Sequence, residues 1–517
     1  MLHRLIRPWA RGWVWIAFLC LGLSSQAQAP LRLPALGDGA EWGLGEERQL
    51  GDGIMAQVWR DPDVLDDPVL AHYVQRLWQP ILSAARARGE LSSELDERFA
   101  WALVLVRDRS VNAFALPGGY MGVHLGLIAA TSNRDELASV LAHETSHITQ
   151  RHIARMMAQQ NRNAPLMMGA LLLGMLAAGR SPDAAGALIV GGQAAAMQNQ
   201  LSFSRDMERE ADRVGFSLLS PAGFHNHGAI TLFDKLIQAS RLNDSGAFPY
   251  LRSHPMSTER MADMAARAQQ LAPWSPTIEP DGWHMLMAGR ARALTDVQAD
   301  GQRRLMVSAQ EQLRRDGRPT PLARGALYAG VMAHMQAREL DQAERLLQAL
   351  QQSLQDDEEV DAGRWLAAEL RLRQGRPEAA LSELSQVSEA ARTSRPQVML
   401  RTEALLDTGR PESVRQAAMA MDVWLGKQPR DALAWEFSGR AQEALGQRLR
   451  SLRAMAESRA VQWDLVAAID RLLAAQELSR ELARQRGLTR SEEYDAAIID
   501  TRLRQLRMAR REQTLQR

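Results

Sequence analysis

The sequence predicts a mostly helical α+β protein, with a small sheet in its first half and an all-α solenoid in its second half. Aromatic residues make up only 5% of the chain against a hydrophobic fraction of 46%, a balance typical of helical proteins. Two apolar, strand-like runs lie close together between residues 99 and 127. Beyond about Pro273, helix pairs rich in Ala, Leu, Arg and Gln are separated by short turns. At 517 residues the chain is too long for one core, so two or more domains are expected.

The first 29 residues have the pattern of a cleaved signal peptide. Arg4, Arg7 and Arg11 form a positive region, and the apolar stretch 13–23 follows it. Small residues between 25 and 29 then offer the spacing that signal peptidase requires. The alternative is an N-terminal membrane anchor, but the apolar stretch is short for a bilayer span.

Cys20 is the only cysteine, and it would leave with the signal peptide. It lacks the small preceding residue of a lipidated cysteine, so no lipoprotein anchor is expected. The mature chain would then have no thiol for disulfides or cysteine catalysis. Such an exported protein fits the periplasm of a Gram-negative bacterium. The formal net charge of +1 gives no indication of nucleic-acid binding.

The segment before Pro273 contains alternating helical and strand-like patterns. Residues 43–82 are helical with breaks at Asp61-Pro62 and Asp66-Asp67-Pro68, and the compact apolar run 99–106 predicts a buried strand. Residues 112–127 contain a proline within a strand-like run, which predicts an edge strand or a bulge. An Asn cap followed by acids at 133–136 opens a long helix, and a further helix covers about 204–219.

Two Gly/Ala-rich apolar stretches, 166–178 and 184–196, follow the long helix. Each is too short to cross a bilayer. One interpretation is a mobile hydrophobic hairpin or lid that touches a membrane surface or a client protein. A plain pair of buried helices explains the same composition equally well.

Short turns recur every 34 to 37 residues in the second half, at Arg338, Gly375, Gly409 and Gly446. This period is close to that of the tetratricopeptide repeat, a helix–turn–helix unit of roughly 34 residues. The spacing therefore predicts a solenoid of helix pairs. A generic helical array remains the alternative, because the repeats are degenerate.

The segment His143-Glu144-Thr145-Ser146-His147 has the residues of a zinc peptidase site. Two histidines four positions apart project from one side of a helix and can bind one metal ion. Glu144 lies beside the apolar stripe of the same helix, where a carboxylate is costly without a polar partner. A water activated by the metal would be such a partner, with Glu144 as its general base. The alternative is a pair of surface histidines around a salt-bridged glutamate.

A catalytic zinc normally takes three protein ligands, so a third must come from elsewhere. The acidic segment 208–212 is the obvious source. Glu208 and Asp212 share one flank of the predicted helix and Glu210 lies on the other. Helical geometry alone does not choose between Glu208 and Glu210.

Four local motifs together resemble those of the HtpX-like zinc metallopeptidases, most closely the periplasmic β-barrel assembly-enhancing protease family with its tetratricopeptide tail. The motifs span roughly residues 40 to 270. They are Asn112-Ala113-Phe114 with Pro117-Gly118-Gly119, His143-Glu144-x-x-His147, Ser204-Arg205 through Glu208-x-x-Ala211-Asp212, and His254-Pro255 with Arg260.

The resemblance implies roles for the remaining polar residues. Glu208 would be the third zinc ligand, and Asp212 would accept a hydrogen bond from a ligating histidine and fix its tautomer. Glu210 would then be a solvated or structural acid. His254 would be a displaceable fourth ligand that holds the enzyme inactive, and Arg260 a cation that stabilises the oxyanion. His124, His152, His225 and His227 have no partner motif and are expected to be ordinary residues.

Proteases of this type bind substrate as an added strand along a free sheet edge. Pro117, Gly118 and Gly119 would lie at that edge, where glycines allow the substrate backbone to approach closely. A tight turn that merely needs glycine explains Gly118 and Gly119 equally well.

The sequence thus predicts a signal peptide (1–29), a zinc metallopeptidase domain (30–272), tetratricopeptide-type repeats (273–479) and a charged C-terminal helix (480–517). One zinc ion per chain would support internal peptide hydrolysis. The resemblance implies unfolded or misassembled outer-membrane proteins as clients and the β-barrel assembly machinery as partner, with chaperone-like assistance of assembly and peripheral contact with the outer membrane. The alternative is mainly a chaperone or adaptor with a repressed metal site.

Overall fold

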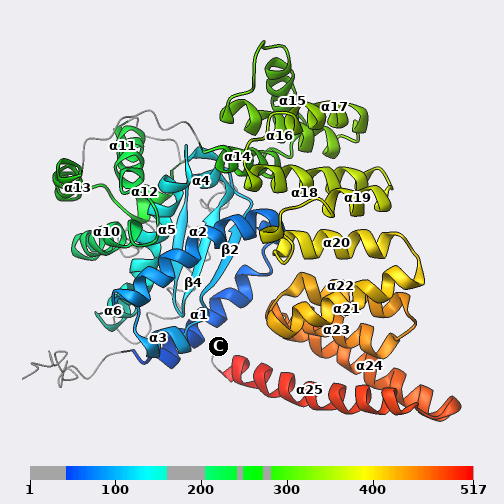
Figure 1. Ribbon diagram of the computed structural model, residues 1–517. Coiled ribbons are helices and arrows are strands. Elements are labelled where there is room, and N and C mark those ends of the chain that lie inside the picture. Colours follow the sequence, from blue (N-terminus) through cyan, green and yellow to red (C-terminus); the bar gives the residue numbers. More distant parts are fainter. Residues whose placement is uncertain (1–41, 160–203, 242–247, 272–280, 516–517) are drawn as a thin grey trace, which may run out of the picture. The chain divides into compact units, whose positions relative to one another are not determined.

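The computed structural model describes residues 42–159, 204–241, 248–271 and 281–515. These residues belong to one compact unit that begins at Trp42 (Figure 1). The predicted signal peptide and the Gly/Ala-rich stretches between 166 and 196 lie outside the described residues. No helix in the described ranges is long and apolar enough to cross a membrane.

The first half of the chain contains a four-stranded sheet, as expected for the predicted α+β class. Its strands are β1 (Val64–Leu65), β2 (Ala102–Val106), β3 (Ala113–Leu116) and β4 (Tyr120–His124), in the order β1-β2-β4-β3. β2 and β4 are parallel, and the outer strands β1 and β3 run antiparallel to their neighbours. β3 is therefore an edge strand.

Helices cover both faces of this sheet, because successive strand residues point to opposite sides. Val104 and Val106 pack with apolar residues of α1 (Leu44–Val58). Leu105, between them, packs in a different cluster with α2 (Pro68–Ala87) and α5 (Arg134–Thr149). The other helices of this half are α3 (Ser93–Arg98), α4 (Leu125–Ala130), α6 (His152–Gln159), α10 (Arg205–Leu219), α11 (His227–Arg241), α12 (Tyr250–Ser253) and α13 (Thr258–Gln270).

The segment predicted as one interrupted strand, 112–127, is a β-hairpin followed by α4. Pro117, Gly118 and Gly119 form its buried turn, with φ of 75° at Gly118 and 84° at Gly119. A Cβ on Gly118 would lie 2.9 Å from the Cα of Arg48, and one on Gly119 would lie 2.8 Å from the Cβ of Phe99. The glycines thus admit other parts of this chain, which corrects the expectation that they admit a substrate backbone. The outer strand of the hairpin, at the edge of the sheet, is β3.

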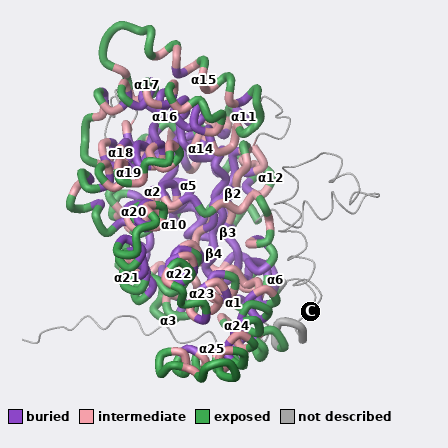
Figure 2. The backbone as a smooth tube through the Cα atoms, turned by 90° about the vertical axis from the view of Figure 1, so that its right-hand side faces the viewer, coloured by how far each residue is buried: buried purple, intermediate pink, exposed green. Residues whose placement is uncertain are grey.

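α5 is buried on nearly all sides (Figure 2). It begins as predicted after Asn133, whose side chain accepts a hydrogen bond from the Glu136 N–H at 2.9 Å. α10 packs closely against α5 because Gly215 has no side chain: a Cβ there would lie 3.0 Å from the backbone nitrogen of His143. This close approach decides which residues of α10 reach the polar residues of α5.

The second half consists of helix pairs, and the predicted turns lie between them. The helices are α14 (Gly282–Thr295), α15 (Ala299–Leu313), α16 (Pro321–Gln336), α17 (Leu340–Gln351), α18 (Asp357–Arg373), α19 (Pro377–Leu384), a 3-10 helix (Glu389–Ala391), α20 (Arg395–Asp407), α21 (Pro411–Lys427), α22 (Ala432–Ala444), α23 (Arg448–Val461), α24 (Leu465–Arg486) and α25 (Arg490–Leu515). φ is 70°, 65° and 75° at Gly375, Gly409 and Gly446, and 61° at Arg338. A residue in the left-handed conformation therefore follows the first helix at the equivalent position of four successive pairs. The charged terminal helix begins at Arg490, since α24 continues through residue 480.

The repeat region packs against the first half of the chain along α2. Asp67 caps α2 by accepting a hydrogen bond from Leu70 N–H, and it also pairs with Arg290 of α14 at 2.7 Å. Asp66 pairs with Arg395 of α20 at 2.7 Å. The Asp66-Asp67-Pro68 segment, which the sequence indicates as a break between helices, is thus also the point where two repeat helices attach.

A second attachment lies at the far end of the repeats. Trp463, in the turn between α23 and α24, has φ of 59° and packs on the apolar cluster formed by α1 and the outer face of the sheet. A residue other than glycine in this backbone region is uncommon and is kept there by its surroundings. The repeats therefore contact the first half of the chain through both α2 and α1.

We predict that Asp67→Ala destabilises the protein by about 3 kcal/mol, because Arg290 would lose a partner while its side chain stays 4% exposed. Thermal unfolding followed by circular dichroism measures this. Asp67→Asn keeps an oxygen for the helix cap and for one contact to Arg290, so it should cost less. Equal melting temperatures for wild type and Asp67→Ala would contradict the attachment.

Candidate metal centre

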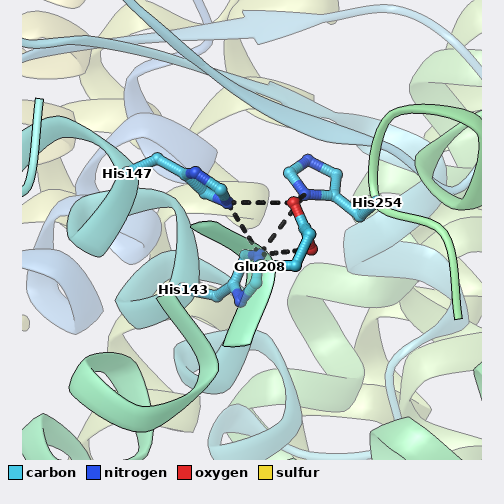
Figure 3. A group of neighbouring side chains, drawn as sticks. All are labelled: His143, His147, Glu208 and His254. Atoms are coloured by element: carbon cyan, nitrogen blue, oxygen red, sulfur yellow. Dashed lines mark hydrogen bonds and ion pairs between the residues drawn. The ribbon is translucent and has the colours of Figure 1, made fainter. Parts of the chain in front are cut away.

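α5 brings His143 and His147 together on one side, at the positions that the i, i+4 spacing predicts. Both are buried, with 6% and 1% of their surface exposed. Their Nε2 atoms lie 3.0 Å apart. Two imidazole nitrogens therefore face the same point in the interior (Figure 3).

Glu208 reaches this point from the first turn of α10. Its Oε2 lies 3.5 Å from His143 Nε2, and its Oε1 lies 3.4 Å from His147 Nε2. The structure thus separates the two acids that helical geometry left open. Glu210 lies elsewhere, 3.1 Å from His152 and 2.8 Å from Arg155.

His254 follows α12 and completes the group. Its Nδ1 lies 2.9 Å from Glu208 Oε1 and 3.3 Å from His143 Nε2. Tyr250 stacks on its ring, with centroids 4.4 Å apart and planes inclined by 25°. The motif resemblance was the only signal for His254, since neither periodicity nor spacing connects it to α5.

The four residues fit a tetrahedral zinc ion. Zinc bonds of about 2.0–2.1 Å to N and O donors put neighbouring donors roughly 3.3 Å apart in a regular tetrahedron. The contacts measured above, which use both oxygens of Glu208, are 2.9 to 3.5 Å long. One donor atom from each of His143, His147, Glu208 and His254 can be chosen so that all four lie within 4.8 Å of one another. The group is therefore able to hold a metal ion, and three histidines with one carboxylate are a donor set that zinc accepts.

The charges around the group also favour a cation. Burial alone would raise the pKa of Glu208, but His254, His143 and His147 hold it well below its ordinary value. Burial alone would lower the pKa of His143, but Asp212 and Glu208 raise it to about 10. The negative charges of Asp212 and Glu208, which raise this pKa, also favour a cation at the centre of the group.

Glu144 lies beside the group, next to the edge strand. Its Oε2 accepts a hydrogen bond from the Ala115 N–H of β3 at 2.9 Å. Its Oε1 has no hydrogen-bond partner within the described ranges, although His254 Nε2 lies 3.4 Å away. Burial raises the pKa of this carboxyl, which His254 and His143 only partly oppose. A buried carboxylate with a raised pKa and one oxygen outside this hydrogen bond is suited to accept a proton and return it.

Asp212 and Arg260 contact the candidate ligands on the side that faces away from the centre of the group. Asp212 Oδ1 lies 3.0 Å from His143 Nδ1, the nitrogen that faces away from the centre. Arg260 holds Asp212 with two hydrogen bonds of 2.7 and 2.8 Å, and its Nη1 lies 2.7 Å from Glu208 Oε2. Nη1 also donates to the backbone carbonyls of His254 and Pro255. Arg260 thus contacts the residues that would hold a metal, which favours a positioning role over the oxyanion contact expected from the sequence.

Two contacts around the site were not expected from the sequence. His152, taken as an ordinary residue, is fully buried against His147, with Nδ1 atoms 2.8 Å apart. Trp78 of α2 donates a hydrogen bond of 2.9 Å to the Thr145 hydroxyl between the two histidines. The short spacing from His147 to His152 was the only available signal for the first, and nothing in the sequence indicates the second.

We predict that Glu208→Gln abolishes stoichiometric zinc binding, whereas Glu210→Gln still binds one zinc ion per chain at saturating metal. The reason is that only Glu208 has oxygens among the histidine nitrogens. Metal analysis after dialysis against a fixed zinc concentration measures the difference. Loss of stoichiometric zinc in Glu210→Gln, with zinc binding by Glu208→Gln unaffected, would show that Glu210 is the ligand and contradict the prediction.

Comparison with known proteins agrees with this site. The family model described as "Peptidase family M48" matches residues 72–268, which include α5, α10 and His254. A mitochondrial metalloendopeptidase OMA1 of Schizosaccharomyces pombe is 35% identical over 165 residues, covering 31% of this chain and 44% of that protein.

Two relatives match nearly the whole chain. The β-barrel assembly-enhancing protease of Escherichia coli K12 is 29% identical over 479 residues, 92% of this chain and 91% of the relative. That of Yersinia pestis is 30% identical over 455 residues, 87% of this chain and 88% of the relative. The resemblance read from the motifs is thus confirmed: the protein is a metalloendopeptidase with a Peptidase M48 domain, and it belongs to the β-barrel assembly-enhancing protease family.

Proposed function

We propose that this protein is a periplasmic zinc endopeptidase that hydrolyses misfolded or misassembled outer-membrane proteins and also assists β-barrel assembly as a chaperone. The observation that supports the chemistry best is the joint position of Glu144 and the four donor residues. Four donors within 4.8 Å of one another lie next to a buried carboxylate, one of whose oxygens accepts no hydrogen bond from the described residues. A purely structural metal site would not need that carboxylate.

His143, His147 and Glu208 would hold the zinc ion in the active state. When bound, zinc supplies Lewis acidity that polarises a peptide carbonyl and makes water easier to deprotonate. Glu144 Oε1 takes a proton from the attacking water and returns it to the leaving amine. Asp212, held by Arg260, keeps the His143 Nδ1–H oriented so that Nε2 faces the metal.

The edge strand β3 suggests how substrate is held. Its Ala115 N–H points at Glu144, away from its neighbour β4. Just before β3, the Val111 carbonyl accepts a hydrogen bond from the Tyr250 N–H at 3.3 Å. The backbone next to β3 therefore already bonds to another segment of this chain. An extended substrate added along β3 would lie beside Glu144 and the donor group. Because the Pro117-Gly118-Gly119 turn is filled by Arg48 and Phe99, we assign it the role of shaping the hairpin that presents β3.

His254 would act as a displaceable fourth ligand. A catalytic zinc site keeps one position open, whereas four protein donors close it. His254 Nδ1 takes the fourth corner, and its Nε2 faces the free oxygen of Glu144. This closed arrangement favours a resting state with little activity. It is also the observation that favours the alternative, a chaperone or adaptor whose metal site stays repressed.

The proposed location and partners rest on the relatives and on the sequence. The relatives are named for enhancing β-barrel assembly. Helix pairs stacked as in the second half of this chain provide extended surfaces for protein binding. We therefore propose that the repeats recruit unfolded outer-membrane proteins and the β-barrel assembly machinery, and that the first 29 residues direct export to the periplasm.

The first test of the chemistry is Glu144→Gln. Removing the base while keeping the shape of the side chain should lower kcat by about 10³-fold on an unfolded protein substrate, with zinc content unchanged. Cleavage assayed by gel electrophoresis with metal analysis in parallel measures both. A zinc chelator should give a similar loss in the wild type, reversed by added zinc. Equal cleavage by wild type and Glu144→Gln would refute the mechanism.

The second test concerns the closed site. His254→Ala should raise cleavage about tenfold, the effect of removing an inhibitory contact of roughly 1.4 kcal/mol. The three remaining ligands should retain zinc. His225→Ala, which changes an exposed histidine outside the donor group, should leave cleavage unchanged. Unchanged or lower cleavage by His254→Ala with intact zinc would count against the inhibitory role.

A further inference from the structure

The second ring nitrogen of His147 makes an unusual contact. His147 Nδ1 lies 2.8 Å from His152 Nδ1. On the other side of the His152 ring, Nε2 lies 3.1 Å from Glu210 Oε2. Arg155 Nη1 holds the same carboxylate oxygen at 2.8 Å. A row of contacts thus runs from the donor group through His152 to an acid and a cation at the surface.

The backbone between α5 and α6 is shaped so that His152 returns to His147. Arg151, between the two helices, has φ of 53°, a left-handed conformation that is costly for a residue other than glycine. Its side chain is held by Glu47, 2.9 Å away and itself buried, and by the Trp42 carbonyl. This conformation is kept only because the surroundings fix it. The turn places His152 edge-on to His147, with ring centroids 4.9 Å apart.

With both rings neutral, the His147–His152 and His152–Glu210 contacts can both be hydrogen bonds only if each histidine donates toward Glu210. Nε2 of His147 faces His143 and Glu208, so it needs a free lone pair to bind a metal. Its proton must then be on Nδ1 and is donated to His152 Nδ1. His152 in turn has its proton on Nε2 and donates it to Glu210. The reverse direction would put a proton on the nitrogen that faces the donor group.

The other α5 histidine is held by groups of the same kind. His143 Nδ1 lies 3.0 Å from Asp212, which Arg260 holds in turn. His147 reaches its acid and cation, Glu210 and Arg155, through His152. Ligating histidines usually donate their second N–H to a carboxylate, a backbone carbonyl or water. An imidazole in this place is a departure that depends on the fixed turn at Arg151.

We propose that His152 and Glu210 are positioning residues that fix the ring orientation and tautomer of His147 as a metal ligand. The proposal rests on the proposed function, in which His147 binds zinc. A surface pair such as Arg155 with Glu210, whose side chains are 48% and 28% exposed, contributes little to stability by itself. Because this pair lies at the end of the row, next to the fully buried His152, its role is to orient His152 and through it His147.

The test uses the full chain and zinc itself as the probe. His152→Leu should weaken zinc binding about 10–100-fold in a competition titration with a chelator. It should also change the visible spectrum of the cobalt-substituted protein, which reports ligand geometry. His152→Gln keeps an acceptor for His147 and a donor for Glu210, so it should recover most of the affinity. Glu210→Ala should weaken zinc binding in the same direction by a smaller factor, which covers the case in which His152→Leu fails to fold.

A matched control lies outside the donor group, in α16. His334 is a buried histidine whose Nδ1 contacts Glu339 at 2.7 Å in the repeats. His334→Gln should leave zinc affinity and the cobalt spectrum unchanged. Wild-type affinity and spectrum in folded His152→Leu, or in Glu210→Ala, would overturn the positioning role. A wild-type protein that binds no zinc would instead overturn the proposed function.

Discussion

The structure depends on the compensation of three carboxylates buried close together in the interior. Glu144, Glu208 and Asp212 are at most 8% exposed, and a buried carboxylate is very costly without cations or hydrogen-bond donors. Arg260 meets two of them, because its guanidinium pairs with Asp212 and lies against Glu208. The histidines face the remaining negative charge, and a divalent cation at their centre would complete the balance. The convergence of α5, α10, α12 and α13 follows from this requirement.

The sequence predicts those parts of the site that depend on local geometry alone. His143 and His147 share a side of one helix at any orientation of that helix, so their pairing follows from spacing. The choice of Glu208 depends instead on how α10 is rotated against α5, and the contact of Gly215 with the His143 backbone sets that rotation. No pattern within α10 indicates it. His152 was missed because an arginine rarely occupies the left-handed turn that brings it back.

The same distinction applies to the fold. The repeat turns could be predicted because glycine at three of four equivalent positions indicates the left-handed conformation that ends each first helix. The packing of the repeats on α2 could not be predicted, because Asp66 and Asp67 before Pro68 have the local pattern of a helix start. Their ion-pair partners, Arg395 and Arg290, are 329 and 223 residues away. A capping carboxylate has further lone pairs, and only the tertiary structure shows what uses them.

The His254 ring contacts both the donor group and the carboxylate proposed as the general base. His254 Nδ1 lies at the fourth corner of the donor group, and its Nε2 lies 3.4 Å from the free oxygen of Glu144. In the proposed mechanism a substrate carbonyl and a water molecule would need these positions, so a single displacement of His254 would free both. The His254 backbone carbonyl is held by Arg260, the residue that also compensates Glu208 and Asp212. Any change that moves His254 must therefore act against the same guanidinium that stabilises the buried carboxylates, which would link the proposed inhibitory contact to the stability of the donor group.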